Sequence, residues 1–300
     1  MIVTLRCRVV ARFGSEIDVL PPTGGILRAH LRRKFDDVVC GDVVLVEPEE
    51  RIVTGRELRV NHLGRQDGFN RHRTIAANID RVWIVVAPRP EIPHLLIDRF
   101  LVGIFNLPAR AAVVINKYDL VDAVTAKSLE ASLTRYRHLD LPVLPVSAHT
   151  GFGMESFRNA AAGGSNILVG QSGVGKSSLI QAMLPEQSLR VGAVGHSGEG
   201  RHTTTTARWY PFAGGGAWID SPGVRDFTPE ITSIDELLRG FPDLGDVADG
   251  CRFRNCTHRS EPGCAVRQVV KQGLLPEARL NAWLELLQGL SGGSSGRRES

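Results

Sequence analysis

Residues 170–177 have the sequence Gly-Gln-Ser-Gly-Val-Gly-Lys-Ser, that is, a glycine, four free positions and then Gly-Lys-Ser. The short apolar run at residues 166–169 predicts a strand before this stretch, and residues 177–184 predict the start of a helix after it. A strand, a glycine-rich loop and a helix in this order are the context that a phosphate-binding P-loop requires. These flanking elements favour a P-loop over a glycine-rich turn with an incidental lysine.

The residue types of this loop suit a polyphosphate. Glycine lets backbone N–H groups approach phosphate oxygens without interference from a Cβ atom, and the following helix directs the positive end of its dipole at the same anion. The Lys176 ammonium would contact the β- and γ-phosphate oxygens, and the Ser177 hydroxyl would bind Mg²⁺. The residues expected to bind the nucleotide here are Gly170, Gln171, Ser172, Gly173, Val174, Gly175, Lys176, Ser177 and Ser178.

Composition sets the broad class of the protein. A chain of 300 residues with 42% hydrophobic and 23% charged residues is typical of a globular protein with two or three domains. It contains no apolar run of about 18 residues and no signal-peptide core, so we expect a cytoplasmic protein that does not interact with membranes. The net charge of +4 gives only weak support for a nucleic-acid partner.

The first 63 residues show short runs of alternating or β-branched residues separated by turn signals. Five or so strands in this length predict a small β-barrel of the OB type, which would bind RNA. Residues 28–34, which carry four fixed positive charges, are expected to be a loop between two strands. A solvated loop is the simpler interpretation; RNA would be bound here through phosphate, because Phe13 and Phe35 are the only aromatic residues of the segment. Residues 64–78 are expected to form an exposed basic linker.

From residue 81 the pattern changes to alternating strands and helices. This rhythm predicts an α/β domain with a parallel sheet that is covered by helices on both faces. The predicted strands are 81–87, 112–115, 143–146, 166–169, 208–210 and 217–219, and the predicted helices are 95–102, 126–138 and 154–161.

Polar motifs follow three of these strands. They are Asn116-Lys117-Tyr118-Asp119, Ser147-Ala148 and Asp220-Ser221-Pro222-Gly223. Ligands of open α/β sheets bind at the carboxyl ends of the strands, so these loops should converge with the P-loop on one crevice. Each motif alone is a weak match, but their combination with a P-loop predicts a GTP site.

The base-reading residues explain the choice of guanine. Asp119 would accept two hydrogen bonds from the N–H groups on the guanine edge, and Asn116 would bind near N7 and O6, whereas adenine offers the wrong donor pattern. The Lys117 stem would lie along the base. Asp220 would hold Mg²⁺ through water, and the Gly223 N–H would contact the γ-phosphate.

The order of these motifs is unusual. The base-reading loops at 116–119 and 147–148 precede the P-loop, whereas an ordinary GTPase has them after it. We therefore expect a circularly permuted GTPase domain, in which the γ-phosphate sensor at 220–223 is the last element and is joined directly to the segment that follows.

Cysteine and histidine residues cluster near the C-terminus. Cys251, Cys256, His258 and Cys264 provide three thiolates and an imidazole within one short stretch, which predicts a structural zinc site. Buried free cysteines beside a surface histidine are the alternative. A helix is predicted from Pro276, with Leu280, Trp283, Leu284 and Leu287 on one face.

The expected domains are a barrel at 1–63, a GTPase domain at 64–229, a zinc-knuckle and helical domain at 230–290, and a disordered tail at 291–300.

This combination of motifs resembles the ribosome small subunit-dependent GTPase family, RsgA, over nearly the whole chain. Further matching stretches are Cys40-Gly41-Asp42-Val43 and Gly200-Arg201-His202-Thr203-Thr204-Thr205. The resemblance implies a bacterial cytoplasmic factor, expected to be a monomer, that binds the small ribosomal subunit and its rRNA late in maturation. It also implies slow hydrolysis of GTP to GDP and phosphate, which the subunit stimulates.

The residue that orients the attacking water is not evident. Val224 and Arg225 follow Gly223, where a Ras-like enzyme has glutamine. His202 is one hypothesis for this role; contact of His202 with RNA or solvent is the other.

The preferred function is a GTP-hydrolysing maturation checkpoint, in which the GTP form holds rRNA through the barrel and zinc domain. The rival is a nucleotide-gated rRNA-binding module with negligible hydrolysis, and an ATP-driven enzyme is disfavoured by Asn116 and Asp119.

Overall fold

The structure is a computed structural model that describes residues 4–66, 72–184, 207–212, 214–220, 229 and 231–293. The chain divides into two compact units. The first unit comprises Met1–Pro90, Leu107–Asp119 and Leu144–Phe227, and the second comprises Glu91–Asn106, Leu120–Val143 and Thr228–Ser300.

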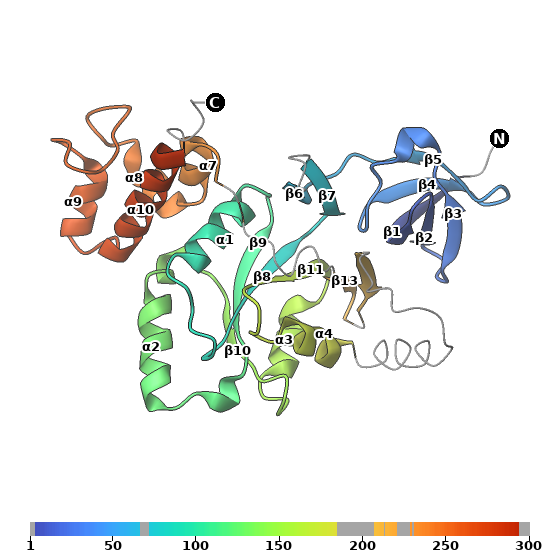
Figure 1. The fold of residues 1–300 in the computed structure, drawn as a ribbon, viewed down its shortest axis with the longest axis horizontal. Helices are drawn as coiled ribbons and strands as arrows, with labels where there is room; N and C mark the ends of the chain where they lie inside the picture. The colour runs from blue at the N-terminus through green and yellow to red at the C-terminus, as the bar shows by residue number, and fades with distance from the viewer. Residues whose placement is uncertain are drawn as a thin grey trace, which may run out of the picture. The chain divides into compact units, whose positions relative to one another are not determined.

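The N-terminal strands of the first unit close into a five-stranded barrel (Figure 1, blue). Its strands are β1 (Leu5–Phe13), β2 (Glu16–Leu20), β3 (Leu27–His30), β4 (Val43–Glu47) and β5 (Ile52–Arg56). The ring closes because β1 pairs with both β2 and β4, while β5 joins β3 to β4. Alternate residues such as Val9, Val19 and Val44 are fully buried in its interior. The predicted barrel is confirmed.

Strand β3 begins later than the sequence pattern indicated, so the expected charged loop at 28–34 is partly wrong. Arg28 and His30 lie on β3 itself, on either side of the fully buried Ala29. The Arg28 guanidinium donates to Asp18 at 2.5 Å and to Glu16 at 3.0 Å on the neighbouring strand β2. Cross-strand ion pairing therefore offsets one of the four charges that the sequence suggested for RNA binding.

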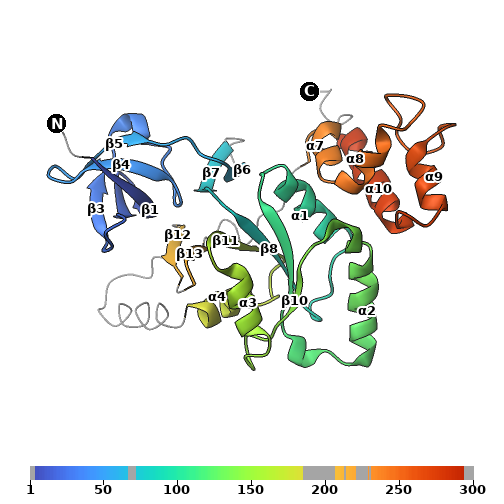
Figure 2. The same ribbon diagram turned by 180° about the vertical axis from the view of Figure 1, so that it is seen from behind.

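The expected basic linker at 64–78 is also wrong for the residues that the structure describes. Strand β6 (His62–Gln66) pairs antiparallel with β7 (His72–Ala77) to form a separate hairpin (Figure 2). Leu63, Ala76 and Ala77 are almost fully buried, and the Ala77 N–H donates to Cys40 O at 3.0 Å. The basic residues at 65, 71 and 73 lie between Leu63 and these alanines in the sequence, which explains why they dominated the sequence pattern.

A mostly parallel sheet carries the predicted motifs. Its order is β10-β9-β8-β11-β13-β12, and the strands are β8 (Arg81–Val86), β9 (Arg110–Ile115), β10 (Val143–Pro145), β11 (Gly164–Val169), β12 (Arg208–Pro211) and β13 (Gly216–Asp220). Strands β9, β8, β11 and β13 are parallel, as predicted. The edge strand β12 is antiparallel to β13, which corrects the expectation of a fully parallel sheet, and it also pairs with β1 of the barrel.

Two helices of the first unit, α3 (Met154–Ala161) and α4 (Lys176–Met183), pack against this sheet. The Phe157 ring lies edge-on to Trp83 and Trp218, with ring centroids 4.8 and 5.4 Å apart. The buried Trp83 N–H donates to the Asn166 side chain at 2.9 Å, so the polar edge of this indole is satisfied in the core. This packing fixes the strands that lead into the motif loops.

The second unit is helical. Its helices are α1 (Leu96–Phe105), α2 (Ala123–Thr134), α7 (Ile234–Arg239), α8 (Pro242–Ala248), α9 (Ala265–Lys271) and α10 (Glu277–Gly293). Phe241 and Trp283 form the centre of its core. Of the predicted stripe on α10, Leu280, Trp283 and Leu287 are buried, whereas Leu284 is only partly buried and packs against the edge of this core.

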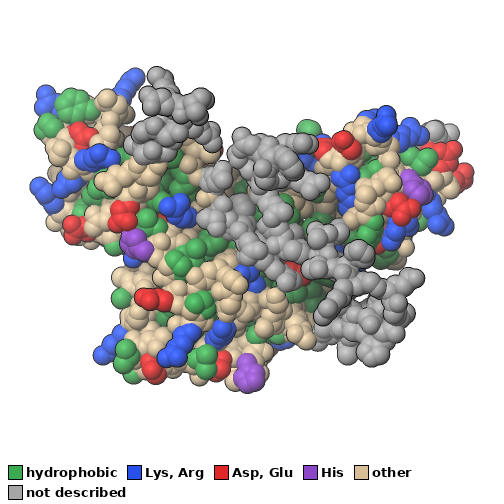
Figure 3. All heavy atoms as spheres, in the orientation of Figure 1, with side chains coloured by type: hydrophobic (Ala, Val, Ile, Leu, Met, Phe, Trp, Pro, Cys, Tyr) green, Lys and Arg blue, Asp and Glu red, His purple; other side chains and the backbone are tan. Residues whose placement is uncertain are grey.

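Helix α10 runs to Gly293, so the predicted disordered tail from residue 291 begins too early, and residues 294–300 lie outside the described part. Among the described residues, no helix is both long and apolar enough to span a membrane. On the face drawn in Figure 3, lysine and arginine side chains lie at many separate points among acidic and neutral ones.

Candidate nucleotide site and metal centre

Asn116 joins three of the predicted motif loops at the carboxyl edge of the sheet. Its side chain is 2% exposed, and its Nδ2 donates to Val174 O at 2.9 Å and to Gly175 O at 3.4 Å in the P-loop. Its Oδ1 accepts from the Ala148 N–H at 3.2 Å. The structure therefore brings together the loops at 116–119, 147–148 and 170–178 even though they are far apart in the sequence. Contact of Asn116 with the base stays a prediction.

The close approach of these loops requires a glycine at position 175. Gly175 has φ +91°, and a Cβ atom there would lie 2.4 Å from Asn116 Nδ2. That contact is shorter than packed heavy atoms tolerate, so a side chain would displace the Asn116 amide from the P-loop. Gly175 also directly precedes α4, whose first N–H groups face the predicted phosphate site.

We expect Gly175→Ala to weaken GDP binding at least tenfold, because the new methyl group separates two of the loops that form the pocket. Titration with a fluorescent GDP analogue measures this. Gly24→Ala is the matched control: Gly24 has φ +84° but no heavy atom within 4 Å of the added Cβ, so it carries only the backbone strain of about 1 kcal/mol. Equal affinity in the two variants would contradict the expectation.

A fourth loop, which sequence analysis missed, also reaches the site. The Lys117 ammonium donates to Gly173 O at 2.6 Å and to Arg89 O at 3.2 Å, and the Gln171 side chain donates to Pro90 O at 3.2 Å. Arg89 and Pro90 follow β8, which lies beside the P-loop strand. Their position after a parallel strand is the one signal that indicates these two residues, because they belong to no recognisable nucleotide-binding motif.

Asp119 is exposed and held in place by Ser147. The Ser147 hydroxyl donates to Asp119 Oδ1 at 2.5 Å and accepts from the Thr150 N–H at 3.1 Å. A carboxylate has several acceptor positions, so Asp119 keeps the capacity to accept further hydrogen bonds. The Tyr118 ring stacks on Phe152 with centroids 5.6 Å apart, which places an aromatic pair beside the same loop.

The predicted phosphate- and Mg²⁺-binding residues that the structure describes follow β11 or end the neighbouring strand β13. The Lys176 ammonium is largely buried and donates to Gly170 O at 2.6 Å and Gln171 O at 2.8 Å, while Ser172, Ser177 and Ser178 are exposed. Asp220 ends β13, the strand that pairs with β11 in parallel. Gly223 and His202 lie outside the described residues, so their roles stay predictions.

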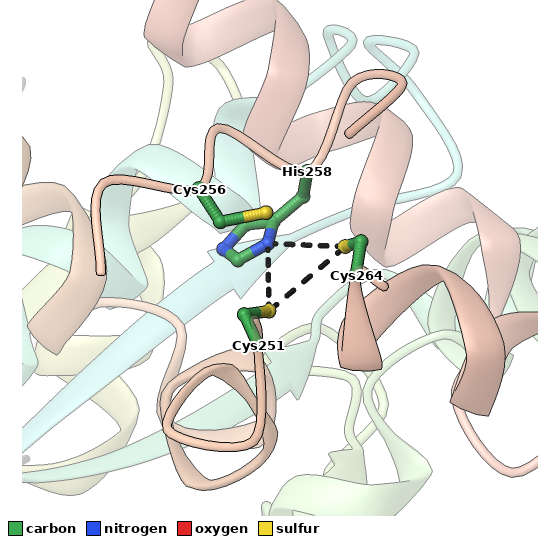
Figure 4. Close-up of side chains that lie close together, drawn as sticks. All are labelled: Cys251, Cys256, His258 and Cys264. Carbon is green, nitrogen blue, oxygen red and sulfur yellow. Dashed lines mark hydrogen bonds between the residues drawn. The ribbon is translucent and has the colours of Figure 1, made fainter. Parts of the chain in front are cut away.

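The four predicted metal ligands converge in the second unit (Figure 4). Their ligand atoms lie within 4.8 Å of one another, and His258 Nδ1 is 3.7 Å from Cys251 Sγ and 3.5 Å from Cys264 Sγ. Tetrahedral ligands about 2.3 Å from a zinc ion lie about 3.8 Å apart, so both the spacing and the Cys₃His donor set fit Zn²⁺.

Two contacts that sequence analysis missed shape this metal centre. Cys264 is the N-cap of α9, where its sulfur accepts from the Arg267 N–H at 3.5 Å. The Glu261 carboxylate accepts from the Thr257 hydroxyl at 2.5 Å and from the N–H groups of Thr257 at 2.9 Å and Ser260 at 3.1 Å. These bonds, that of the hydroxyl first, lower the pKa of Glu261 to about 2. Glu261 therefore fixes the turn between the second and fourth ligands. No metal-ligand spacing rule would have indicated it.

The comparisons with known proteins agree with this geometry. The family model described as RsgA GTPase matches residues 56–230, which is more than half of the chain. The chain belongs to the RsgA GTPase family. Membership in this family makes it a GTPase, and the described GTPase sheet has its motif loops in the permuted order.

Similar proteins cover almost all of the chain. "Small ribosomal subunit biogenesis GTPase RsgA" of Pseudomonas fluorescens is 40% identical over 94% of this chain and 84% of the relative, and that of Pseudomonas aeruginosa is 40% identical over 93% and 84%. Among solved structures, YjeQ from Thermotoga maritima has TM-score 0.79 and 31% identity, covering 99% of this chain and 100% of that one. YloQ, described as a circularly permuted GTPase, has TM-score 0.76 and 25% identity, covering 97% of this chain and 96% of that one.

Proposed function

We propose that this RsgA-family GTPase binds the small ribosomal subunit late in its maturation and hydrolyses GTP there, with subunit-stimulated turnover. The similarity to small ribosomal subunit biogenesis GTPases of Pseudomonas supports the small subunit as the partner. The observation that carries the nucleotide assignment is the pair of hydrogen bonds from the Asn116 amide to the P-loop and from Ala148 to Asn116, since it unites the base-reading and phosphate-binding loops.

Each loop then has a role in the bound complex. Asp119, oriented by Ser147, reads the guanine N–H groups, and the stem of Lys117 lies along the base. Lys176 would exchange its backbone carbonyl partners for phosphate oxygens. Ser177 and Asp220 would hold Mg²⁺, which when bound neutralises charge on the phosphates.

The organisation into a barrel, a permuted GTPase domain and a zinc-knuckle domain is part of the same proposal. The barrel and the zinc-knuckle domain contact rRNA in the GTP form, and hydrolysis releases them. Zn²⁺ held by the Cys₃His cluster would stabilise the knuckle, and the protein acts as a cytoplasmic monomer. His202 orients the attacking water when the subunit is bound.

Single-turnover hydrolysis of radiolabelled GTP, with and without purified small subunits, tests the function. Stimulation of several-fold or more by subunits is expected, and its absence at saturating subunit concentration would favour the rival, a nucleotide-gated rRNA-binding module. His202→Ala, assayed in parallel, should lose most of the stimulation while GDP affinity is unchanged. Near wild-type turnover would remove His202 from the mechanism.

Asp119→Asn is expected to weaken GTP binding roughly 10- to 100-fold, because the asparagine side chain has one acceptor oxygen and so loses one of the two hydrogen bonds, and a bond to a charged carboxylate is worth about 1.5–3 kcal/mol. The same variant should gain affinity for xanthosine triphosphate, whose carbonyl at C2 accepts from the new amide. Competition against a fluorescent nucleotide measures both changes. Asp140→Asn, an exposed turn residue, is the matched control; an unchanged preference in Asp119→Asn would refute the guanine assignment.

A further inference from the structure

A cavity of about 480 Å³ lies in the first unit at the amino ends of the parallel strands. Arg81 and Arg110, the first residues of β8 and β9, line it together with Gly164, the first residue of β11. The proposed GTP site follows the carboxyl ends of the same strands. The cavity is therefore at the opposite edge of the sheet, and no nucleotide-site residue lines it.

Arg81 and Arg110 lie side by side. They are direct partners in the parallel register of β8 and β9, so their side chains leave the sheet on the same face. The Arg81 guanidinium lies 5.2 Å from the centroid of the Trp83 ring, which fixes its position on that face. Like charges at directly paired positions destabilise a sheet unless an anion lies between or above them.

The barrel adds two further arginines, Arg6 and Arg8, from alternate positions of β1. Glu57 binds Arg6 through two hydrogen bonds of 2.6 and 2.9 Å, so this charge is offset. The Arg8 guanidinium instead donates to a neutral acceptor, Gly41 O, at 2.7 Å. Within the described part of the chain, Arg8 has no carboxylate at ion-pair distance.

The cavity consequently carries an excess of positive charge. Four guanidinium groups and two carboxylates, those of Glu57 and Asp80, line it. Burial, and then repulsion from Arg110, lower the pKa of Arg81, although Asp80 partly opposes this. Burial, and then repulsion from Arg6, likewise lower the pKa of Arg8, although Asp80, Glu57 and Asp42 partly oppose this. A bound anion would favour the charged forms of Arg81 and Arg8 and so oppose the lowering of both pKa values.

Apolar side chains stand at the same cavity. Leu58 is 98% exposed and Val60 is 77% exposed, and both contribute to the lining. Isolated apolar residues at the surface are ordinary, but here they border clustered cations in a volume typical of small-molecule sites. That combination suits a ligand with phosphate groups at one end and a flat apolar part at the other.

We propose that this cavity is a second anion site, which binds a small phosphate-bearing molecule of nucleotide size. Arg8, Arg81 and Arg110 hold the phosphate groups, and Leu58 and Val60 cover the apolar part. A polynucleotide phosphate offers the same chemistry, but the arginines lie within a cavity rather than along a groove that a strand could follow.

Isothermal titration of the full chain, saturated with GDP, tests the proposal with ADP and inorganic pyrophosphate as probes. GDP then occupies the P-loop, so neither ADP nor pyrophosphate can bind there. One molecule of ADP per chain should bind, and Arg81→Gln/Arg110→Gln should weaken ADP and pyrophosphate at least tenfold. Arg32→Gln/Arg33→Gln, which changes two exposed barrel arginines outside the cavity, should leave both affinities unchanged.

The variants must retain wild-type GDP affinity, which shows that they are folded and keeps this test separate from the proposed GTPase function. The absence of ADP and pyrophosphate binding to the wild-type protein would overturn the proposal. An equal loss of ADP and pyrophosphate affinity in both double variants would also overturn the proposal. Binding would then depend on the overall positive charge of the protein rather than on the cavity. If only a single-stranded oligoribonucleotide loses affinity in Arg81→Gln/Arg110→Gln, the cavity is part of an RNA surface and the small-molecule assignment is wrong.

Discussion

Cys264→Ser is expected to abolish stoichiometric zinc binding and to unfold the region around the knuckle. A structural zinc ion contributes about 10 kcal/mol or more of binding energy to folding, and this variant removes one of four ligands. Serine is itself a good N-cap, so the start of α9 is preserved and the loss is due to the metal ligand. Metal analysis should give one zinc per wild-type chain and almost none in the variant.

Hydrogen exchange locates the effect. Amides of α9 and of the 251–264 segment should lose protection both in Cys264→Ser and in wild-type protein treated with a chelator. Cys7→Ser is the matched control, because Cys7 is a buried cysteine of the barrel that belongs to no cluster of metal ligands among the described residues. A fully zinc-loaded, protected Cys264→Ser protein would show that the cluster is not a zinc site.

Arg279→Ala is expected to destabilise the second unit by about 3–5 kcal/mol, the cost of leaving a buried ion pair without one partner. The Arg279 side chain is fully buried and joins α10 to two other helices. It donates to Asp98 of α1 at 2.6 Å and holds Asp243 of α8 through two hydrogen bonds of 2.8 Å. Its guanidinium also lies 4.1 Å from the centroid of the Phe241 ring.

Removal of Arg279 would leave the Asp243 carboxylate without these two hydrogen bonds, and would leave the buried Asp98 carboxylate with the Tyr136 hydroxyl at 2.8 Å and the more distant Arg135 guanidinium at 3.7 Å. Exchange protection of α10 amides should fall more than a hundredfold, which corresponds to about 3 kcal/mol. Arg239→Ala, an exposed arginine of α7 bonded to Asn106, should cost less than about 1 kcal/mol. Similar effects in both variants would contradict the buried-network interpretation.

The parts of the fold that could be predicted from the sequence are those that local patterns determine. Buried strands such as Val82–Val86 and the helix at 154–161 have strong patterns, and the structure places them within a residue or two of the prediction. The convergence of the loops followed from a general rule about parallel sheets, and the Asn116 contacts agree with it.

The misses have a common cause, which is that the deciding contacts are distant in the sequence. Strand β12 is antiparallel because it pairs with both β13 and the barrel, and β3 extends through Arg28 because the acidic residues of β2 lie opposite it. The Asp98–Arg279 pair joins residues 181 positions apart. No helical periodicity indicates such a pair, since Arg279 looks like an ordinary surface arginine of an amphipathic helix.

The strand order also has a consequence for synthesis of the chain. Strand β8 lies between β9, which follows it closely, and β11, which is made much later. Until β11 leaves the ribosome, one side of β8 presents unpaired N–H and C=O groups along the almost wholly buried segment Arg81–Val86. Such an apolar edge readily pairs with other chains. The permuted strand order therefore leaves the β11 side of β8 without its partner until residues Gly164–Val169 have been translated.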